Sequence, residues 1–569
     1  MRTRKRWKVL VLILVAVGAV FAVRRARQAP SIKPGSYLLV EFGGSYGEGP
    51  PQDILGSLLH RRERMLMDTL MMIREAQVDA RIAGVIARVR RLEVGWGKLQ
   101  DIRDALVEFK QSGKPLVALL EEEAHGSNRE YFLASAADRV YLAPNVTAPL
   151  SGLAATSLFL GGVWEKLDID MTVEKIGAYK TFGDTLANKE MSPAHREMTE
   201  SILTDISEQF LAAIAQARGL DPQAVKAIVD DCPVTPADFE AARLADGTRY
   251  LEDLREEIGG EQTPLVRMED YARVRPGSLG LGVGPKVGVI FGVGGITTGD
   301  SGTGVRGDTL GADTLVKALQ DVAEDAEVRA VVFRIDSPGG SALASDLVWR
   351  ATQSLRKKKP LIVSMSDVAA SGGYYIAAGA TRIVAAPGTL TGSIGVVFAR
   401  PNVRGLLARF GVNAETISTG KFAPLDDLTT PLSPEGRGKL VAEMRHVYDI
   451  FLQRVSSGRG LSTTRVDELA QGRVWTGMQA KERGLVDELG GFRTAVQVAK
   501  AAAGIEAKQE VELVYYPRRE GVLGQLSDLL GTRASAALPP TWRKVVQTLA
   551  LPFEDATVLT LMPESIDVH

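Results

Sequence analysis

The sequence is poor in the residues from which disulfide frameworks and metal sites are built. Its 569 residues include a single cysteine, Cys232, so no disulfide can form within the chain, and the redox compartment stays open. The five histidines are scattered, and no two of them have the i, i+4 spacing of a zinc-binding helix. We therefore predict no catalytic metal, and the chemistry considered below requires no cofactor.

Net charge is also nearly absent. The 68 lysines and arginines balance 69 aspartates and glutamates, which leaves a formal charge of −1 at pH 7. Such a balance gives no global positive field, so nucleic acid is not an expected partner. The composition, 45% hydrophobic and 24% charged, is that of a globular protein, and 569 residues exceed what one hydrophobic core usually supports. At least two domains are expected.

One long apolar run lies at the N-terminus. Residues 9–23 carry only apolar side chains and glycine, and the run approaches the roughly 20 residues that cross a bilayer core. Five basic residues precede it and three follow by position 27, a bias that favours a cytoplasmic N-terminus. We predict an uncleaved transmembrane helix within residues 1–30. A cleaved signal peptide is the alternative, although Arg24 and Arg25 form a poor flank for cleavage.

The rest of the chain contains an internal duplication. Residues 128–144 align with residues 371–387 at a displacement of 243 positions, with Asn128 in the place of Ser371. Further on, Lys180 aligns with Lys421 at a displacement of 241 positions, and several neighbours follow the same displacement. Agreement over so many positions indicates two tandem copies of one unit. One copy has lost a serine that the other keeps, whereas both keep a lysine.

Both copies predict the same alternation of strands and helices. The predicted strands are apolar runs at 37–42, 83–89 and 115–120 in the first copy and at 286–291, 330–335 and 360–365 in the second. Helical stretches at 64–76 and 310–325 join the first two strands of each copy. Repeated β-α-β units predict an α/β fold with a mainly parallel sheet covered by helices.

Glycine and composition shifts give the domain boundaries. The glycine-rich stretch at 275–285 separates the two copies. We therefore predict a first repeat domain over 31–275, a second over 276–505 and a C-terminal tail over 506–569. The tail includes an apolar stretch that is too short to cross a membrane, so we expect it to serve packing or subunit contact.

Ser371 is the first candidate for chemistry. It lies in Ala369-Ala-Ser371-Gly-Gly-Tyr374, between a predicted buried strand and a predicted helix. Two glycines remove bulk beside the hydroxyl, and a helix N-terminus supplies free backbone N–H groups and the positive end of a dipole. This setting suits a nucleophile. Taken alone, a serine at this place is more often a simple helix N-cap.

The motif Asp336-Ser-Pro-Gly339-Gly340-Ser341 strengthens this interpretation. It too follows a predicted strand, and its glycines expose backbone amides that suit the oxyanion of an acyl-transfer intermediate. The corresponding stretch of the first copy, residues 88–97, has lost Ser-Pro-Gly-Gly. Nucleophile and oxyanion loop are therefore absent together from one copy, which a purely structural role for each does not predict.

A lysine is the candidate base, because no histidine lies near either motif in the sequence. A lysine amine with its ordinary pKa of about 10.4 is protonated at neutral pH, but burial lowers that pKa by several units and yields a neutral amine. A neutral amine accepts a hydroxyl proton. Lys180 and Lys421 are the two equivalent candidates. A single lysine is usually a solvated surface charge, and retention at equivalent places in both copies favours function.

These residues resemble the signal peptide peptidase A family, membrane-anchored serine peptidases with a Ser-Lys dyad, in its long tandem-repeat form. The resemblance covers about residues 37–504. The motifs that carry it are Asp336-Ser-Pro-Gly-Gly, Ala370-Ser-Gly-Gly-Tyr, Leu390-Thr-Gly-Ser-Ile-Gly395, Ala178-Tyr-Lys180, Met191-Ser-Pro193 and Gly484-Leu-Val-Asp-Glu-Leu-Gly490. The resemblance implies two ClpP/crotonase-like domains and a bowl-shaped homo-oligomer, expected to be a tetramer.

The resemblance also implies roles for individual residues. In the long form the second copy supplies the nucleophile and the first copy the base, which assigns Ser371 and Lys180. Ser393 would hydrogen-bond the lysine amine and help to orient it. The oxyanion hole would be formed by the amide of Gly339 or Gly340 together with that of Gly372. Lys421 would face Asn128 and form a dead site, and Ser127 lies one place away from the nucleophile position.

The expected function is a single-pass serine endopeptidase of the bacterial inner membrane with its catalytic domains on the periplasmic side. Its expected substrates are cleaved signal peptides and other membrane-associated or misfolded peptides, held in an apolar pocket. Two alternatives stay open. One is a catalytically weak oligomeric scaffold or regulator at the membrane. The other is a crotonase-type acyl-CoA enzyme, which shares the fold class but would have to bind CoA.

Overall fold

The computed structural model describes residues 31–49, 64–121, 126–260, 262–304, 307–517, 559–561 and 567–568. The predicted membrane anchor within residues 1–30 lies outside these ranges. Among the described residues, no helix combines the length and hydropathy needed to cross a bilayer.

The first repeat is built on a six-stranded parallel sheet with the order β10-β1-β4-β5-β6-β9. All five residues of β5 are buried, as expected for a strand covered on both faces by helices. The helices α3 (Leu66–Val78) and α4 (Trp96–Lys110) follow β3 (Arg64–Met65) and β4 in the chain. The strands are β1 (Ser36–Gly44), β4 (Ile82–Leu92), β5 (Leu116–Leu120), β6 (Arg139–Leu142), β9 (Gly247–Thr248) and β10 (Leu265–Arg267).

The second repeat contains an eight-stranded sheet in which β11, β15, β17, β18 and β22 repeat the parallel order of the first. The predicted α/β fold is therefore confirmed. Its helices include α13 (Ala312–Glu324), α14 (Ala342–Arg356) and α20 (Phe492–Ala502). The strands are β11 (Lys286–Val293), β15 (Val328–Ser337), β17 (Leu361–Ala370), β18 (Arg382–Ala385), β19 (Leu390–Gly392), β21 (Val474–Thr476), β22 (Glu488–Leu489) and β23 (Glu512–Tyr516).

A third sheet joins the two repeats. Strand β8 (Asp170–Ile176) of the first repeat pairs antiparallel with β20 (Val396–Asn402) of the second, in a register that sets Ile176 opposite Val396. Lys180 follows the end of β8 and Ser393 precedes β20, so this pairing brings the lysine of one repeat to a loop of the other. The same sheet contains β16 (Gly339–Ser341) and β24 (Leu559–Leu561). It is completed by β12 (Gly295–Thr297), β13 (Gly302–Gly304) and β14 (Gly307–Gly311).

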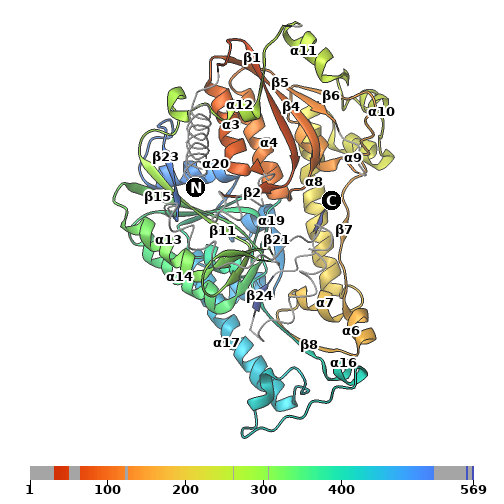
Figure 1. Ribbon diagram of the computed structural model, residues 1–569, viewed down its shortest axis with the longest axis vertical. Helices are drawn as coiled ribbons and strands as arrows, with labels where there is room; N and C mark the ends of the chain where they lie inside the picture. Colours follow the sequence, from red (N-terminus) through yellow and green to blue (C-terminus); the bar gives the residue numbers. More distant parts are fainter. Residues whose placement is uncertain are drawn as a thin grey trace, which may run out of the picture.

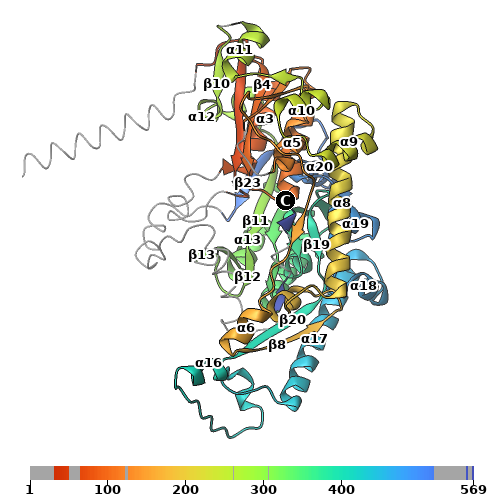
Figure 2. The same ribbon diagram turned by 90° about the vertical axis from the view of Figure 1, so that its right-hand side faces the viewer.

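Two long helices of equal length mark the repeats. These are α8 (Pro193–Arg218) and α17 (Pro434–Arg459), each 26 residues long. Each begins with a serine N-cap followed by proline at the first helical position, which is the arrangement that favours a helix start. Helix α8 runs down one side of the molecule from the first sheet and packs against β21 of the second repeat (Figures 1 and 2).

The apolar core is continuous across the two repeats. Leu38 and Val40 of β1 belong to the same buried cluster as Ile362 and Ala370 of β17. Helix α4 of the first repeat packs against β17 of the second, so a first-repeat helix lies directly under the strand that leads to Ser371. The two repeats therefore form one packed body.

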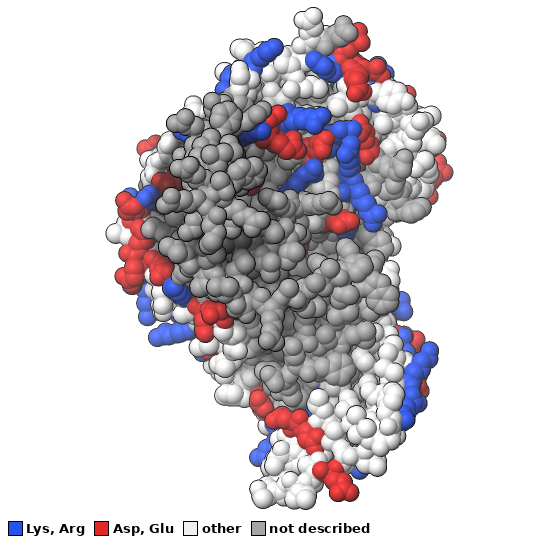
Figure 3. Space-filling model, in the orientation of Figure 1, with Lys and Arg blue, Asp and Glu red and all other residues white. Residues whose placement is uncertain are grey.

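On the face shown in Figure 3, acidic and basic side chains of the described residues are interspersed.

Candidate active site

Ser371 lies in the turn between β17 and α15 (Gly372–Ala377) in an unusual backbone conformation. Its φ is 54° and its ψ −115°, and a non-glycine residue at positive φ is uncommon and strained. The surrounding structure fixes it, because the Ser371 amide donates a hydrogen bond of 2.8 Å to the carbonyl of Gly392. Such strain at a single polar residue is typical of a functional position.

Lys180 of the first repeat reaches this serine. Its Nζ lies 2.7 Å from Ser371 Oγ, 2.9 Å from Ser393 Oγ and 2.8 Å from the carbonyl oxygen of Ser393. The lysine is fully buried. Burial lowers the pKa of Lys180 well below its usual value, because a charged ammonium loses its solvation there. The structure thus brings together the three side chains that the sequence singled out.

The three contacts fit a neutral amine. A neutral amine has two N–H donors and one lone pair, whereas an ammonium has three donors and no acceptor. In the neutral state, the Ser393 carbonyl and the Ser393 hydroxyl can accept the two N–H groups, and the lone pair can then face the Ser371 hydroxyl. Among the described residues, no carboxylate forms an ion pair with Lys180 that would hold its proton. This arrangement can take a proton from Ser371.

A turn at 471–473 of the second repeat holds both sides of the site. The carbonyl of Gln471 accepts a 2.7 Å hydrogen bond from the Tyr179 amide, and the carbonyl of Arg473 accepts one of 2.7 Å from the Ser393 amide. A Cβ on Gly472 would lie 2.5 Å from the Lys180 backbone nitrogen, so only glycine fits. Sequence reasoning missed this turn, because its glycine signals a bend but not a partner almost 300 residues earlier in the chain.

The candidate oxyanion glycines lie beside Ser371. A Cβ on Gly340 would lie 2.1 Å from the carbonyl oxygen of Ile296, and a Cβ on Gly372 would lie 3.1 Å from the Gly340 nitrogen. Gly340 and Gly372 are therefore neighbours. The amide of Gly339 instead donates a 3.2 Å hydrogen bond to Ser337 Oγ. Its position next to Gly372 makes Gly340 a candidate partner of Gly372 in an oxyanion hole.

An extended segment of the chain lies along the glycine strand. Residues 559–561 form β24, which pairs antiparallel with β16 and sets Leu561 opposite Gly339 and Thr560 opposite Gly340. On its other side β24 pairs with β20. A peptide backbone therefore fits between these two strands, next to the glycines and Ser371.

The second lysine and the asparagine of the first repeat are not brought together within one chain. Lys421 is exposed, and its Nζ lies 3.4 Å from Glu435 Oε1. Asn128 is buried at the start of α5 (Asn128–Ala134), where its side chain exchanges hydrogen bonds of 2.9 and 3.1 Å with the backbone of Gly152. The hydroxyl of the neighbouring Ser127 is buried without a hydrogen-bond partner among the described residues.

Comparison with known proteins identifies the family of this chain. The family model described as Peptidase family S49 matches residues 108–262 and 353–506, one match in each repeat. The chloroplastic serine protease SPPA of Arabidopsis thaliana is 37% identical over 467 residues, 80% of this chain and 68% of that protein. Protease 4 of Salmonella typhi is 31% identical over 560 residues, 93% of this chain and 88% of that protein.

Among solved structures, a ClpP1 mutant from Listeria monocytogenes superposes with a TM-score of 0.24 at 14% identity, over 37% of this chain and 94% of that one. The two family matches and the identity to full-length relatives decide the assignment. The chain therefore belongs to peptidase family S49 and is a serine peptidase of the SppA type, with the family domain in tandem.

Proposed function

We propose that this peptidase works with a Ser-Lys dyad, in which Ser371 is the nucleophile and Lys180 the general base. The observation that carries the proposal is the 2.7 Å separation between a fully buried Lys180 Nζ and Ser371 Oγ. Burial lowers the pKa of Lys180 well below its usual value, which favours the neutral amine that takes a hydroxyl proton. Both groups also lie in buried turns between regular elements.

In the proposed reaction, Ser371 Oγ attacks the carbonyl carbon of the scissile bond while its proton passes to Lys180 Nζ. The oxyanion that forms accepts hydrogen bonds from the amides of Gly372 and Gly340. The Lys180 ammonium then donates its proton to the leaving amine as the C–N bond breaks. A water molecule, deprotonated by the same amine, releases the acyl group from Ser371. Ser393 holds the amine in position through both steps.

The proposed substrates are peptides bound in an extended conformation. Strand β24 supports this proposal, because it shows a backbone accommodated between β16 and β20. Main-chain pairing of this kind tolerates many side chains. Helix α14 begins directly after β16 and exposes Leu343 and Leu347 one turn apart. Apolar side chains beside the glycine strand suit the apolar cores of cleaved signal peptides, the substrate class we propose.

We further propose a homo-oligomer, expected as a tetramer, that is anchored in the bacterial inner membrane by residues 9–23 and faces the periplasm. By its displacement of 241 positions, the segment 411–417 is the second-repeat equivalent of β8, yet it forms no strand. This segment and its flank expose Phe410, Val412 and Ile417 to 79%, 50% and 99%. Exposed apolar side chains on an unpaired strand equivalent favour pairing with another copy.

A fluorophosphonate probe tests the proposed nucleophile. We expect the full-length protein to hydrolyse an unstructured apolar peptide and to carry the label on Ser371, as located by mass spectrometry of its peptides. Lys421→Ala serves as the matched control and should label normally. Label on a different serine would overturn the assignment. A folded, oligomeric protein with neither label nor hydrolysis would favour the scaffold alternative.

A further inference from the structure

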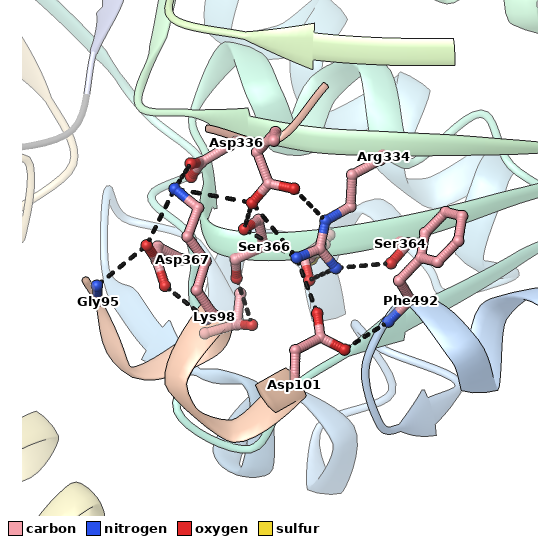
Figure 4. A network of polar contacts seen from close by, with 12 residues as sticks. Gly95, Lys98, Asp101, Arg334, Asp336, Ser364, Ser366, Asp367 and Phe492 are labelled. Carbon is pink, nitrogen blue, oxygen red and sulfur yellow. Dashed lines mark hydrogen bonds and ion pairs between the residues drawn. The ribbon is translucent and has the colours of Figure 1, made fainter. Parts of the chain in front are cut away.

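A second lysine of the first repeat enters the second repeat close to the site. Lys98, in the first turn of α4, places its Nζ 2.6 Å from Asp336 Oδ2 and 3.3 Å from Asp367 Oδ2 (Figure 4). It also lies 3.7 Å from Glu48 Oε1. Only 12% of the Lys98 side chain is exposed. This lysine has no part in the proton transfers described above.

The two aspartates stand where the catalytic loops begin. Asp336 belongs to the end of β15, directly before the loop that carries Gly340, and Asp367 belongs to β17, four residues before Ser371. The other oxygen of Asp336 accepts a 3.1 Å hydrogen bond from the Val368 amide. One ammonium therefore connects the strand end that leads to the oxyanion glycines with the strand end that leads to Ser371.

Helix α4 is held in place to present this lysine. The Asp367 carboxylate accepts hydrogen bonds of 3.1 Å from the Gly95 amide and 2.7 Å from the Lys98 amide, which caps the first turn of α4 from the other repeat. Behind it, the buried Arg334 guanidinium lies 2.8 Å from Asp101 Oδ2, one turn further along α4. Figure 4 shows both contacts on the same side of the helix.

Lys98 supplies the positive charge that lies between the two aspartates. Burial lowers the pKa of Lys98, but the surrounding carboxylates outweigh it and raise that pKa well above its usual value. Burial raises the pKa of Asp336, and Lys98 opposes that rise. Without the ammonium, Asp336 and Asp367 would face each other as buried like charges, which is strongly unfavourable. The two strand ends would then move apart, or the Asp336 carboxylate would take up a proton.

We propose that Lys98 is a positioning residue that sets the distance between the oxyanion glycines and Ser371 by bridging Asp336 and Asp367. The inference rests on the proposed Ser-Lys mechanism and adds to it a second contribution from the repeat that has no nucleophile. The equivalent helix of the second repeat has Ala344 at the same place, so the bridge exists in one direction only. Lys98 acts through the aspartates and touches no reacting atom.

Lys98→Met in the full-length protein tests the proposal. We expect kcat per titrated Ser371 to fall about 10- to 100-fold, since a displaced oxyanion donor costs a factor of this order. We expect KM to stay within about threefold, because main-chain pairing with β16 and β20 persists. Affinity for a peptide aldehyde, whose serine adduct presents an oxyanion, should fall with kcat. Lys98→Arg, which keeps the positive charge, should retain most of the wild-type kcat and aldehyde affinity.

Glu108→Gln is the matched control. Glu108 lies on the same helix and forms a similar ion pair between the repeats, 2.5 Å from Arg493 on α20, but it does not contact the catalytic loops. The Glu108→Gln substitution should leave kcat and the affinity for the peptide aldehyde unchanged. A second variant, Asp336→Asn, guards against unfolding of the first. If Lys98 acts through Asp336, then Lys98→Met should lower kcat less in the Asp336→Asn protein than it does in the wild-type protein.

Three results would overturn the proposal. These are wild-type kcat per titrated serine in Lys98→Met, equal losses in Lys98→Met and Glu108→Gln, and additive effects of Lys98→Met and Asp336→Asn. Failure of the proposed mechanism itself looks different. In that case the wild-type protein would carry no fluorophosphonate on Ser371, and no titrated serine would exist for the variants to be compared with.

Discussion

The two repeats share a scaffold down to single hydrogen bonds, yet they differ at the position of the proposed nucleophile. Tyr131 donates a hydrogen bond of 2.7 Å to the carbonyl of Leu244, and its equivalent Tyr374 donates one of 2.9 Å to the carbonyl of Leu485. Equivalent arginine-aspartate pairs follow in both repeats. The framework that places the turn has therefore been retained in both halves.

The difference lies in where the helix begins. In the first repeat Asn128 is the first residue of α5 and has a helical conformation. In the second repeat Ser371 precedes α15 and stays at φ 54°, outside the helix. The Asn128 side chain closes on the backbone of Gly152, whereas Ser371 Oγ points to Lys180. At this pair of equivalent positions, only the second repeat has a strained backbone.

The largest expected difference between the repeats concerns their serines. Ser371→Ala should reduce peptide hydrolysis about 10⁵- to 10⁶-fold, because removal of a nucleophile abolishes the covalent route. Ser127→Ala should leave hydrolysis within about twofold, since the buried Ser127 hydroxyl has no hydrogen-bond partner among the described residues for the substitution to remove. Initial rates on one apolar peptide measure both. Comparable losses in the two variants would show that the first repeat also carries chemistry.

The lysines should differ nearly as much. Lys180→Met should reduce kcat/KM about 10⁴-fold, because the hydroxyl then has no base. Lys421→Met should keep most of the activity, because Lys421 is exposed and pairs with Glu435. The reverse result would move the base to the second repeat and to a contact between copies.

Lys180→Met should also stabilise the protein. The folded-state pKa of Lys180 lies below its unfolded value, so between the two the unfolded chain binds the additional proton. Stability at neutral pH is reduced by that difference and rises with pH toward the ordinary lysine pKa. The methionine variant should therefore melt about 2–4 °C higher near pH 7. Calorimetry at pH 7 and pH 10 should show the gain shrinking at the higher pH.

The rate at which Ser371 reacts with a fluorophosphonate should depend on pH. In the proposed mechanism the reactive form contains the neutral Lys180 amine, so the labelling rate should rise with pH through the lowered pKa and then level off. Below that pKa the rate should fall about tenfold per pH unit. Fluorophosphonate labelling rates between pH 4 and 10 provide the measurement. A rise only near the ordinary lysine pKa of about 10.4 would contradict a neutral buried base.

The smallest effect is expected from placing a serine at the nucleophile position of the first repeat. Asn128→Ser in the Ser371→Ala background should give no label at position 128. That position is helical, and residues 88–97 lack the Ser-Pro-Gly-Gly loop. Label at position 128 would mean that the scaffold alone suffices for a nucleophile, whatever the strain.

Local sequence patterns were sufficient for much of the fold and for part of the site. Continuous apolar runs predicted the parallel strands, although β17 runs on to Ala370, five residues beyond the predicted end. The motifs around Ser371 and Ser393 were visible because each is contiguous. Only the resemblance to the signal peptide peptidase A family predicted that Ser371 and Lys180 lie in one site. The pairing of β8 with β20 connects segments more than 200 residues apart, and no local pattern specifies it.

Lys98 shows the same limit more sharply. In the sequence it is an ordinary basic residue in a helix, and its partners Asp336 and Asp367 lie 238 and 269 residues further along. A buried charge gives no local signal, because burial depends on how the repeats pack. Gly472 is similar, since its contact with the backbone of Lys180 arises only in the folded chain.

The β8–β20 pairing has a consequence for how the enzyme behaves on dilution. Because amine and hydroxyl belong to one polypeptide, their encounter is intramolecular, with an effective concentration on the order of millimolar or above. A lone subunit in a nanomolar solution would still hold the proton-transfer pair in register. Activity lost at low enzyme concentration would therefore report separation of subunits or loss of substrate binding, with the dyad itself intact.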